Sequence, residues 1–395
     1  MDDDDDEDDM EVDEQEDANA GGAQADGGEN AGDLMEFHDD SCQAFFAHQK
    51  PVYTVSMHPT HHELILSGGE DETGYLWLTS TGETLHALAG HTDSVVATGF
   101  SHDGALCATG GMDGLTLVWD VATGANVARI ETGSEVVWLH WHPRGPVLLT
   151  GTADGQVWMN NLPSGTLMGV FGGVHAAPLT CGGFSPDGKL VYSGAEDGTF
   201  ALWDPKTLST VWKHSPDNGR WFQEESVTAA AVAGNLVLVG GSGGNARAVN
   251  LSTGTVLSSF ATNSESIESI DFSPNLPYAA LASTDGKVTV LDMSHMTVRM
   301  TLTHKDAVVK ALYTADGYHL VTCSTDLSVR VWDSRSGTHV TTWLGHQEPI
   351  LCMAISPMAD IVVTGSDEGT CLVFRPPQQS EAEAAAAAAA GAGSA

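Results

Sequence analysis

Histidine, a hydroxyl residue and aspartate recur in a fixed order along this chain, and acyl-transfer enzymes combine these groups into catalytic triads. In three stretches the histidine precedes the aspartate by 22 residues, a serine or threonine lies between them, and a tryptophan follows the aspartate by six residues. The three sets are His91, Thr109, Asp113 and Trp119; His175, Ser193, Asp197 and Trp203; and His304, Thr322, Asp326 and Trp332. An enzyme needs one catalytic site, whereas residues that hold a repeated fold together recur in each repeat. The repetition therefore favours a structural role and a protein that is not an enzyme.

Other groupings that could do chemistry are weaker. The densest histidine group is HPTHH (His58, His61 and His62), which stands where comparable segments have turns such as SPDG. It therefore predicts a solvated turn rather than a metal site. The glycine-rich GGSGGN (240–245) follows no strand-to-helix pattern, and the six cysteines form no CxxC pair or zinc-type spacing. We expect no metal and no cofactor.

The chain between residues 42 and 378 repeats itself. Short runs of alternating apolar and polar residues are separated by turn sequences such as SPDG and HDG, which is typical of antiparallel sheet. Aligned on the position six residues after the turn acid, successive units are 41 to 46 residues apart. The eight aligned positions are Trp77, Trp119, Asn160, Trp203, Val249, Leu291, Trp332 and Phe374. This period, with GH and WD marks, resembles the WD40 family and implies an all-β fold, an eight-bladed β-propeller.

The resemblance to WD40 proteins implies a role for the three repeated sets. In that family the acid holds the histidine, the hydroxyl bridges the histidine to the tryptophan, and the tryptophan N–H is satisfied, so the network rigidifies each blade. Two units depart from the pattern. The third has Asn160 in place of the tryptophan, with Trp158 nearby, and the fifth lacks both the acid and the tryptophan.

Composition divides the chain into three parts. Residues 1–40 carry 19 acidic side chains and no lysine or arginine, so residues 1–41 are predicted to be a disordered acidic tail. Residues 379–395 are a low-complexity, alanine-rich tail. The propeller is expected over 42–378. Its last unit ends before it could supply an outermost strand, so Cys42–His48 is predicted to pair there and close the ring.

The net charge narrows the choice of partners. The formal charge is −38, and half of it belongs to the part of the chain after residue 40. This disfavours nucleic acids and anionic membranes, and it favours a basic protein partner. The N-terminal segment has no apolar signal region, and no stretch approaches 18 apolar residues, so a cytoplasmic monomer with reduced thiols is expected. Entry into the nucleus with a client is left open.

Two sets of positions are expected to crowd one rim of the ring. One set lies two residues after the marked histidine or its equivalent, and the other lies directly before the turn acid. The acids in these sets are Asp93, Glu225, Glu265, Asp306 and Glu348, followed by Glu70, Glu196 and Asp367. Lys50 is the single base in either set. Acid at the first position is partly a WD40 habit, but a rim with eight carboxylates should attract a cationic peptide in a salt-sensitive way.

The third unit points to a narrower family. It reads EVVWLHWHPRGPVLLTGTADGQVWM (135–159), with Trp138 and Trp141 on one strand. This sequence is similar to the angio-associated migratory cell protein family, and so are GHTDSVVATGFSHDGALCATGGMDG and LVTCSTDLSVRVWDSRSG. The alternative for the two tryptophans is ordinary blade packing.

The fungal member of that family is a dedicated chaperone for a large-subunit ribosomal protein. The resemblance implies capture of the basic N-terminus of a newly made ribosomal protein. The pre-ribosome is then an indirect partner, and large-subunit assembly is the outcome. The acidic tail would serve the same client by raising effective concentration.

Two other functions remain open. A scaffold in signalling or migration would bind through apolar or aromatic rim residues with little salt dependence. A histone-type acidic chaperone would bind any basic tail equally well.

Overall fold

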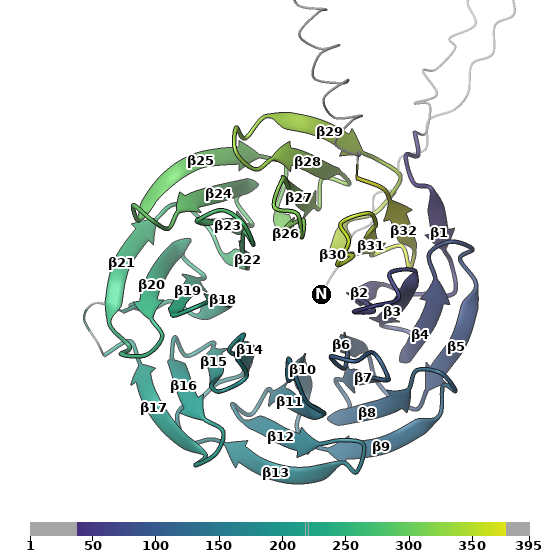
Figure 1. Ribbon diagram of the computed structural model, residues 1–395, viewed down its shortest axis with the longest axis horizontal. Helices are drawn as coiled ribbons and strands as arrows, with labels where there is room; N and C mark the ends of the chain where they lie inside the picture. Colours follow the sequence, from purple (N-terminus) through teal and green to yellow (C-terminus); the bar gives the residue numbers. More distant parts are fainter. Residues whose placement is uncertain (1–37, 218, 220, 377–395) are drawn as a thin grey trace, which may run out of the picture. The chain divides into compact units, whose positions relative to one another are not determined.

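The computed structural model describes residues 38–217, 219 and 221–376. Within them, 32 strands and no helix form eight four-stranded antiparallel sheets. The sheets stand around one axis like the blades of a propeller (Figure 1), so the predicted eight-bladed fold is confirmed. No helix in the described ranges has the length and hydropathy of a membrane span. The predicted alanine-rich tail 379–395 and residues 1–37 of the predicted acidic tail 1–41 lie outside the described residues.

Each blade is a meander whose first strand lies next to the central axis. Blade 1 contains β2 (Val52–Met57), β3 (Leu64–Gly69), β4 (Thr73–Leu78) and β5 (Thr84–Ala89). Blade 2 contains β6 (Val95–Phe100), β7 (Leu106–Gly111), β8 (Leu115–Asp120) and β9 (Asn126–Glu131). Blade 3 contains β10 (Val136–Trp141), β11 (Val147–Thr152), β12 (Val157–Asn161) and β13 (Thr166–Phe171). Blade 4 contains β14 (Leu179–Phe184), β15 (Val191–Ala195), β16 (Phe200–Asp204) and β17 (Ser209–His214).

The second half of the ring follows the same order. Blade 5 contains β18 (Val227–Ala233), β19 (Leu236–Gly241), β20 (Asn245–Asn250) and β21 (Val256–Ala261). Blade 6 contains β22 (Ile267–Phe272), β23 (Tyr278–Ser283), β24 (Lys287–Asp292) and β25 (Thr297–Thr303). Blade 7 contains β26 (Val308–Tyr313), β27 (His319–Ser324), β28 (Val329–Asp333) and β29 (His339–Trp343). Blade 8 contains β30 (Ile350–Ile355), β31 (Val362–Ser366), β32 (Cys371–Phe374) and β1 (Gln43–Phe45).

The hydrophobic core lies between neighbouring blades. The middle strand β27 is buried at every residue, whereas the outermost strand β5 fully buries only Leu88. Val321 of blade 7 and Met353 of blade 8 belong to one buried cluster. A strand that packs against a blade on both faces must be apolar on both faces. The outer strands alternate because one of their faces meets water.

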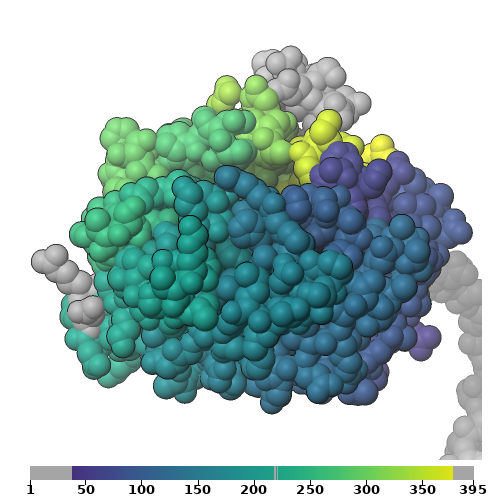
Figure 2. All heavy atoms as spheres, turned by 60° about the horizontal axis from the view of Figure 1, so that its bottom comes forward, coloured from purple at the N-terminus to yellow at the C-terminus, as the bar shows by residue number. Residues whose placement is uncertain are grey.

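Blade 8 takes its outermost strand from the other end of the chain. β1 pairs antiparallel with β32, with Gln43 opposite Val373 and Phe45 opposite Cys371. The C-terminal strands, drawn in yellow, therefore adjoin the purple N-terminal segment (Figure 2). The strand spans three residues, fewer than the seven of the predicted closing segment 42–48. Phe45 is 1% exposed, and its ring stacks 4.6 Å from that of Trp77, which joins blade 8 to blade 1.

One turn expected to be solvated is instead tied to the next blade. His58 is buried, its Nε2 lies 3.0 Å from the Gly104 carbonyl oxygen of blade 2, and its Nδ1 accepts a hydrogen bond from the backbone N–H of His61. Burial lowers the pKa of His58. His142 makes the same kind of contact from blade 3 to the Gly188 carbonyl oxygen of blade 4, at 3.2 Å. The prediction of a solvated turn was therefore wrong for His58, because the repeat lets a turn histidine reach the neighbouring turn.

The two tryptophans of β10 pack between blades. Trp141 Nε1 donates to the Gly99 carbonyl oxygen of blade 2 at 3.1 Å. The Trp138 ring covers Gly182 of blade 4 so closely that a Cβ there would lie 2.1 Å from it. The glycines on the facing strands therefore make room for the rings.

Candidate binding rim and the relays beneath it

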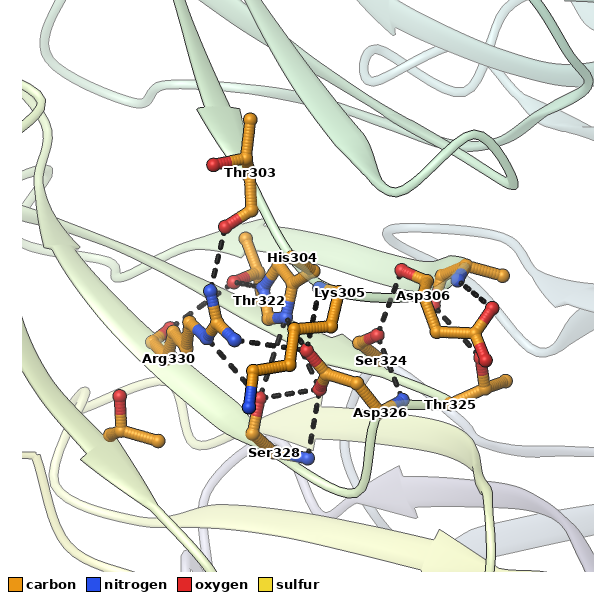
Figure 3. A network of polar contacts seen from close by, with 12 residues as sticks. Thr303, His304, Lys305, Asp306, Thr322, Ser324, Thr325, Asp326, Ser328 and Arg330 are labelled. Carbon is orange, nitrogen blue, oxygen red and sulfur yellow. Dashed lines mark hydrogen bonds and ion pairs between the residues drawn. The ribbon is translucent and has the colours of Figure 1, made fainter.

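The repeated polar residues of blade 7 form a continuous hydrogen-bond relay. Figure 3 shows its part around His304, Thr322 and Asp326. His304 Nδ1 lies 3.3 Å from Asp326 Oδ2, and its Nε2 lies 2.7 Å from Thr322 Oγ1. Trp332 Nε1 donates to the same hydroxyl at 2.9 Å. Thr322 is fully buried and its hydroxyl is shared between His304 and Trp332, so the set serves the packing of the blade.

The acid of this relay is held in its charged form. Burial alone would raise the pKa of Asp326, but hydrogen bonds from His304, Ser328 and the backbone N–H of Lys305 outweigh burial and hold the pKa well below its usual range. Arg330 adds an ion pair, with Nη2 2.9 Å from Asp326 Oδ2. Asp326 is therefore already neutralised within its blade.

The same geometry recurs in blades 1 and 2. In blade 2, His91 Nδ1 lies 3.1 Å from Asp113 and Nε2 lies 2.8 Å from Thr109 Oγ1. Trp119 Nε1 donates to that hydroxyl at 3.0 Å. Blade 1 repeats the arrangement with His48, Ser67, Asp71 and Trp77.

Blade 4 departs from the expected contact between acid and histidine. The hydroxyl of Thr199 lies between them, 2.5 Å from His175 Nδ1 and 2.5 Å from Asp197 Oδ1. The rest of the relay is as expected, because Ser193 Oγ lies 2.7 Å from His175 Nε2 and accepts from Trp203 Nε1 at 2.9 Å. Burial lowers the pKa of His175 to about 4, so the ring is neutral. The expectation that Asp197 holds His175 directly is corrected to a contact through Thr199.

Blade 8 contains a relay that sequence reasoning missed. His346 Nδ1 lies 2.7 Å from Glu368 Oε1, and Nε2 lies 2.8 Å from Thr364 Oγ1. Burial would raise the pKa of Glu368, but hydrogen bonds from His346 and Thr370 lower it to about 2. Phe374 stands where blades 1, 2, 4 and 7 have the tryptophan, so the set was not recognised in the sequence. The GH dipeptide at Gly345-His346, 42 residues after His304 of blade 7, could have indicated this relay.

Backbone hydrogen bonds bring the two predicted sets of rim positions together. In every blade, the residue before the turn acid donates its N–H, at 2.9–3.0 Å, to the carbonyl of the residue that follows the loop position. The eight pairs are Glu70 to Pro51, Met112 to Ser94, Ala153 to Glu135, Glu196 to Pro178, Ser242 to Ser226, Thr284 to Ser266, Thr325 to Ala307 and Asp367 to Pro349. Both sets therefore lie side by side on one edge of each blade. We call this edge the acidic rim; its predicted acids are Asp93, Glu225, Glu265, Asp306, Glu348, Glu70, Glu196 and Asp367.

Six of these eight carboxylates are exposed. They are Asp93, Glu196, Glu265, Asp306, Glu348 and Asp367. Glu70 is half-buried, lies 3.3 Å from Lys50 Nζ, and accepts a hydrogen bond from the Tyr53 hydroxyl at 3.2 Å. Burial and the neighbouring Glu70 raise the pKa of Tyr53. The charge of Glu70 is therefore partly compensated at the rim.

Glu225 turns into its blade. Its Oε1 accepts a hydrogen bond from Asn245 Nδ2 at 2.6 Å, and a Cβ on Gly243 would lie 2.7 Å from its carboxyl carbon. Gly243 occupies the position of the turn acid in other blades, so Glu225 fills the space of the missing acid. Its assignment as an acid that faces a partner is not supported by this placement. In the sequence, the missing turn acid of the fifth unit could have indicated that Glu225 turns inward.

Blade 3 adds acids that the two sets did not include. Thr132 replaces the relay histidine, and its hydroxyl donates to the Gly114 carbonyl oxygen at 2.8 Å. Without a histidine to hold it, the turn acid Asp154 stays exposed, and Glu135 beside it is exposed as well. Loss of the relay thus converts a structural acid into a rim acid.

Positive charge on the rim is unevenly distributed. The loops and turns that form the rim in blades 2, 3, 4 and 8 contain no lysine or arginine. In blades 6 and 7, by contrast, Lys287 lies 3.4 Å from Asp285, Lys305 is exposed, and Arg330 holds Asp326. The uncompensated negative charge is therefore concentrated outside blades 6 and 7. Over the described ranges, no three His, Cys, Asp or Glu side chains are grouped so that they could hold a metal ion.

Comparison with known proteins identifies the class and then the family. A family model for the N-terminal domain of nucleolar protein 10-like proteins matches residues 122–368, and the WD domain, G-beta repeat model matches residues 40–77 and 82–120. The chain is thus a WD40-repeat β-propeller of the kind these models describe. It is 39% identical to the angio-associated migratory cell protein of Homo sapiens over 355 residues, which are 86% of this chain and 81% of that protein. It belongs to the angio-associated migratory cell protein family.

Two fungal proteins are also similar to the chain. The chain is 24% identical over 388 residues to the ribosome assembly protein SQT1 of Saccharomyces cerevisiae, and the match covers 87% of this chain and 88% of that protein. The crystal structure of Chaetomium thermophilum Sqt1 bound to the N-terminus of the ribosomal protein L10 is also similar. Its TM-score is 0.81 at 29% identity, over 86% of this chain and all of that one.

Proposed function

We propose that this protein is a non-enzymatic chaperone. It captures the basic N-terminus of a newly made large-subunit ribosomal protein on the acidic rim and supports assembly of the large ribosomal subunit. The relative from Chaetomium thermophilum, which is bound to the N-terminus of ribosomal protein L10, suggests the client. The observation that carries the proposal is the set of eight backbone hydrogen bonds that gathers the predicted acid positions on one rim.

The rim has the chemistry that such a client requires. Newly made ribosomal proteins are strongly basic and bind RNA without discrimination. Exposed carboxylates such as Glu348 and Asp367 supply competing negative charge, and their field raises the rate of encounter with a cationic segment. The relay acids beneath them are held by histidines and backbone N–H groups, so they stiffen the loops rather than bind the client.

A peptide titration tests this function. A peptide with the sequence of the L10 N-terminus and a histone-tail peptide of equal charge are titrated into the full chain at two salt concentrations. Tight, salt-weakened binding of the ribosomal peptide alone is expected. Equal binding of both peptides would indicate a general acidic chaperone, and no binding of either would overturn the proposal.

Charge reversals locate the binding surface. The pair Glu348→Lys and Asp367→Lys should weaken binding of the ribosomal peptide by roughly tenfold at low salt and flatten its salt dependence. Glu83→Lys is a matched control, because Glu83 is exposed in the turn between β4 and β5, at the opposite end of the strands. Equal losses for the rim and control variants would place the binding surface elsewhere.

A further inference from the structure

An exposed aromatic ring stands at the edge of the acidic rim. Phe46 follows the closing strand β1 and is 71% exposed, although its neighbour Phe45 is 1% exposed and stacks on Trp77. Successive side chains of a strand point to opposite sides, so Phe45 enters the core and Phe46 faces solvent. In the described part of the chain, no other ring and no guanidinium packs against Phe46. Its ring is therefore available to a partner.

The repeat provides an internal control for this position. Phe45 is opposite Cys371, so the next step of the ladder places Phe46 opposite Thr370, the second residue after the turn acid Glu368. The residues at the same register in blades 1 to 7 are Ala89, Glu131, Gly172, Ser215, Ala261, Thr303 and Leu344. None of them is aromatic. The fold therefore does not require a ring here, and aromatic side chains, Phe included, are enriched at the cores of protein–protein interfaces.

The surroundings of Phe46 are acidic. The hydroxyl of Thr370, opposite it in the ladder, donates to Glu368 Oε1. Asp367 precedes that acid, and its backbone N–H reaches the Pro349 carbonyl oxygen at 3.0 Å, beside Glu348. The rim loop and turn of blade 8 contain no lysine or arginine, and Lys50, whose backbone lies against Gly369 of that turn, is paired with Glu70 at 3.3 Å. A cation drawn to these carboxylates would reach the face of the ring.

We infer that Phe46 receives an arginine or lysine side chain of the basic client on its ring face, while Asp367 and Glu348 balance the charge. A cation over an aromatic face is attracted by the quadrupole of the ring, and the attraction grows as water is excluded. The inference rests on the proposed function. The ring would select a cation at one defined position of the client. A diffuse acidic surface attracts cations without selecting their position.

Variants at this one position test the inference in the full chain, with the L10 N-terminal peptide as the probe. Phe46→Ala should weaken binding about fivefold to tenfold at both salt concentrations, without changing the salt dependence, because no charge is lost. Phe46→Trp should bind at least as tightly as the wild type. Phe46→Leu should lose nearly as much as the alanine variant, because it keeps apolar area but lacks the ring. The melting temperature of Phe46→Ala should be unchanged, since the side chain is exposed.

Leu85→Ala is the matched control, because Leu85 is 42% exposed on β5, away from the rim. It should bind like the wild type. If Phe46→Ala binds like the wild type while Glu348→Lys is weakened, the inference fails and the proposed function stands. If Phe46→Leu binds the peptide as tightly as the wild type, an apolar side chain is sufficient at this position, and the inference is overturned. An equal loss in Leu85→Ala would also overturn it. Absence of binding to the wild-type chain would refute the proposed function itself.

Discussion

Replacing Asp271 with asparagine should stabilise the propeller at neutral pH and lose that advantage in acid. Asp271 lies on β22 of blade 6, and its Oδ2 accepts a hydrogen bond from the backbone N–H of Tyr313 in blade 7 at 2.7 Å. Burial raises the pKa of Asp271 from 3.8 to about 6, although the N–H groups of Tyr313 and Phe272 act in the opposite direction. An amide keeps an acceptor for Tyr313 and carries no charge to bury.

The sign and size follow from proton linkage. Between pH 3.8 and about 6 the folded chain binds more protons at this carboxyl than the unfolded chain does, so wild-type stability falls as the pH rises through that window. The full shift corresponds to roughly 3 kcal/mol above pH 7. Replacing the carboxyl acceptor with the weaker-fitting amide oxygen costs the variant about 1 kcal/mol at every pH. Asp271→Asn should therefore gain about 2 kcal/mol at pH 7.5.

The assay is urea unfolding followed by tryptophan fluorescence at pH 4.5, 6.0 and 7.5. The difference in unfolding free energy between Asp271→Asn and the wild type should rise by roughly 2 kcal/mol from pH 4.5 to 7.5. Glu268→Gln is the control, because Glu268 is exposed on the same strand and solvated in both states. A difference for Asp271→Asn that is the same at all three pH values would refute the reasoning.

Five other substitutions, in three tests, probe the packing and the relays. Thr109→Val should lower the free energy of unfolding by about 3 kcal/mol, because it leaves a histidine and a tryptophan N–H without their partner. Thr364→Val in blade 8 should lower it by about half as much, because no tryptophan depends on that hydroxyl. Urea unfolding compares the two variants, and equal losses would contradict the relay. Gly182→Ala should lower the melting temperature by several degrees, because its Cβ would meet Trp138. Adding Trp138→Leu to this variant should recover part of the loss, and no recovery would show that the clash is elsewhere. Phe45→Ala should destabilise the ring by about 3–5 kcal/mol in urea unfolding, while an unchanged midpoint would show that the closing strand contributes little.

The architecture could be predicted because every blade must present the same apolar faces to its neighbours. That requirement imposes one period on the chain, and the marks at Trp77, Trp203 and Trp332 fall in register with it. The position of the closing strand followed from the missing partner of β32. Its length did not follow, because three residues at Gln43–Phe45 are enough to cover that edge.

The site was less predictable, because sequence register gives a residue's place along the chain and not the direction of its side chain. Glu225 stands at a rim position but turns inward, since Gly243 leaves space that a carboxylate can fill. Asp154 was not among the predicted rim acids, and it is exposed because its blade has no relay histidine. The contact through Thr199 in blade 4 likewise depends on a side-chain rotation that no spacing encodes.

The closing strand also sets an order in time. The backbone N–H of Cys42 bonds the Val373 carbonyl oxygen, and the two residues are 331 positions apart. A ribosome that adds 5–20 residues per second needs roughly 15 seconds to one minute to cover that distance. Throughout that interval the strand Gln43–Phe45 has no partner, and the sector of the rim that holds Glu348 and Asp367 does not yet exist. The acidic rim is therefore complete only when the last blade has been synthesised.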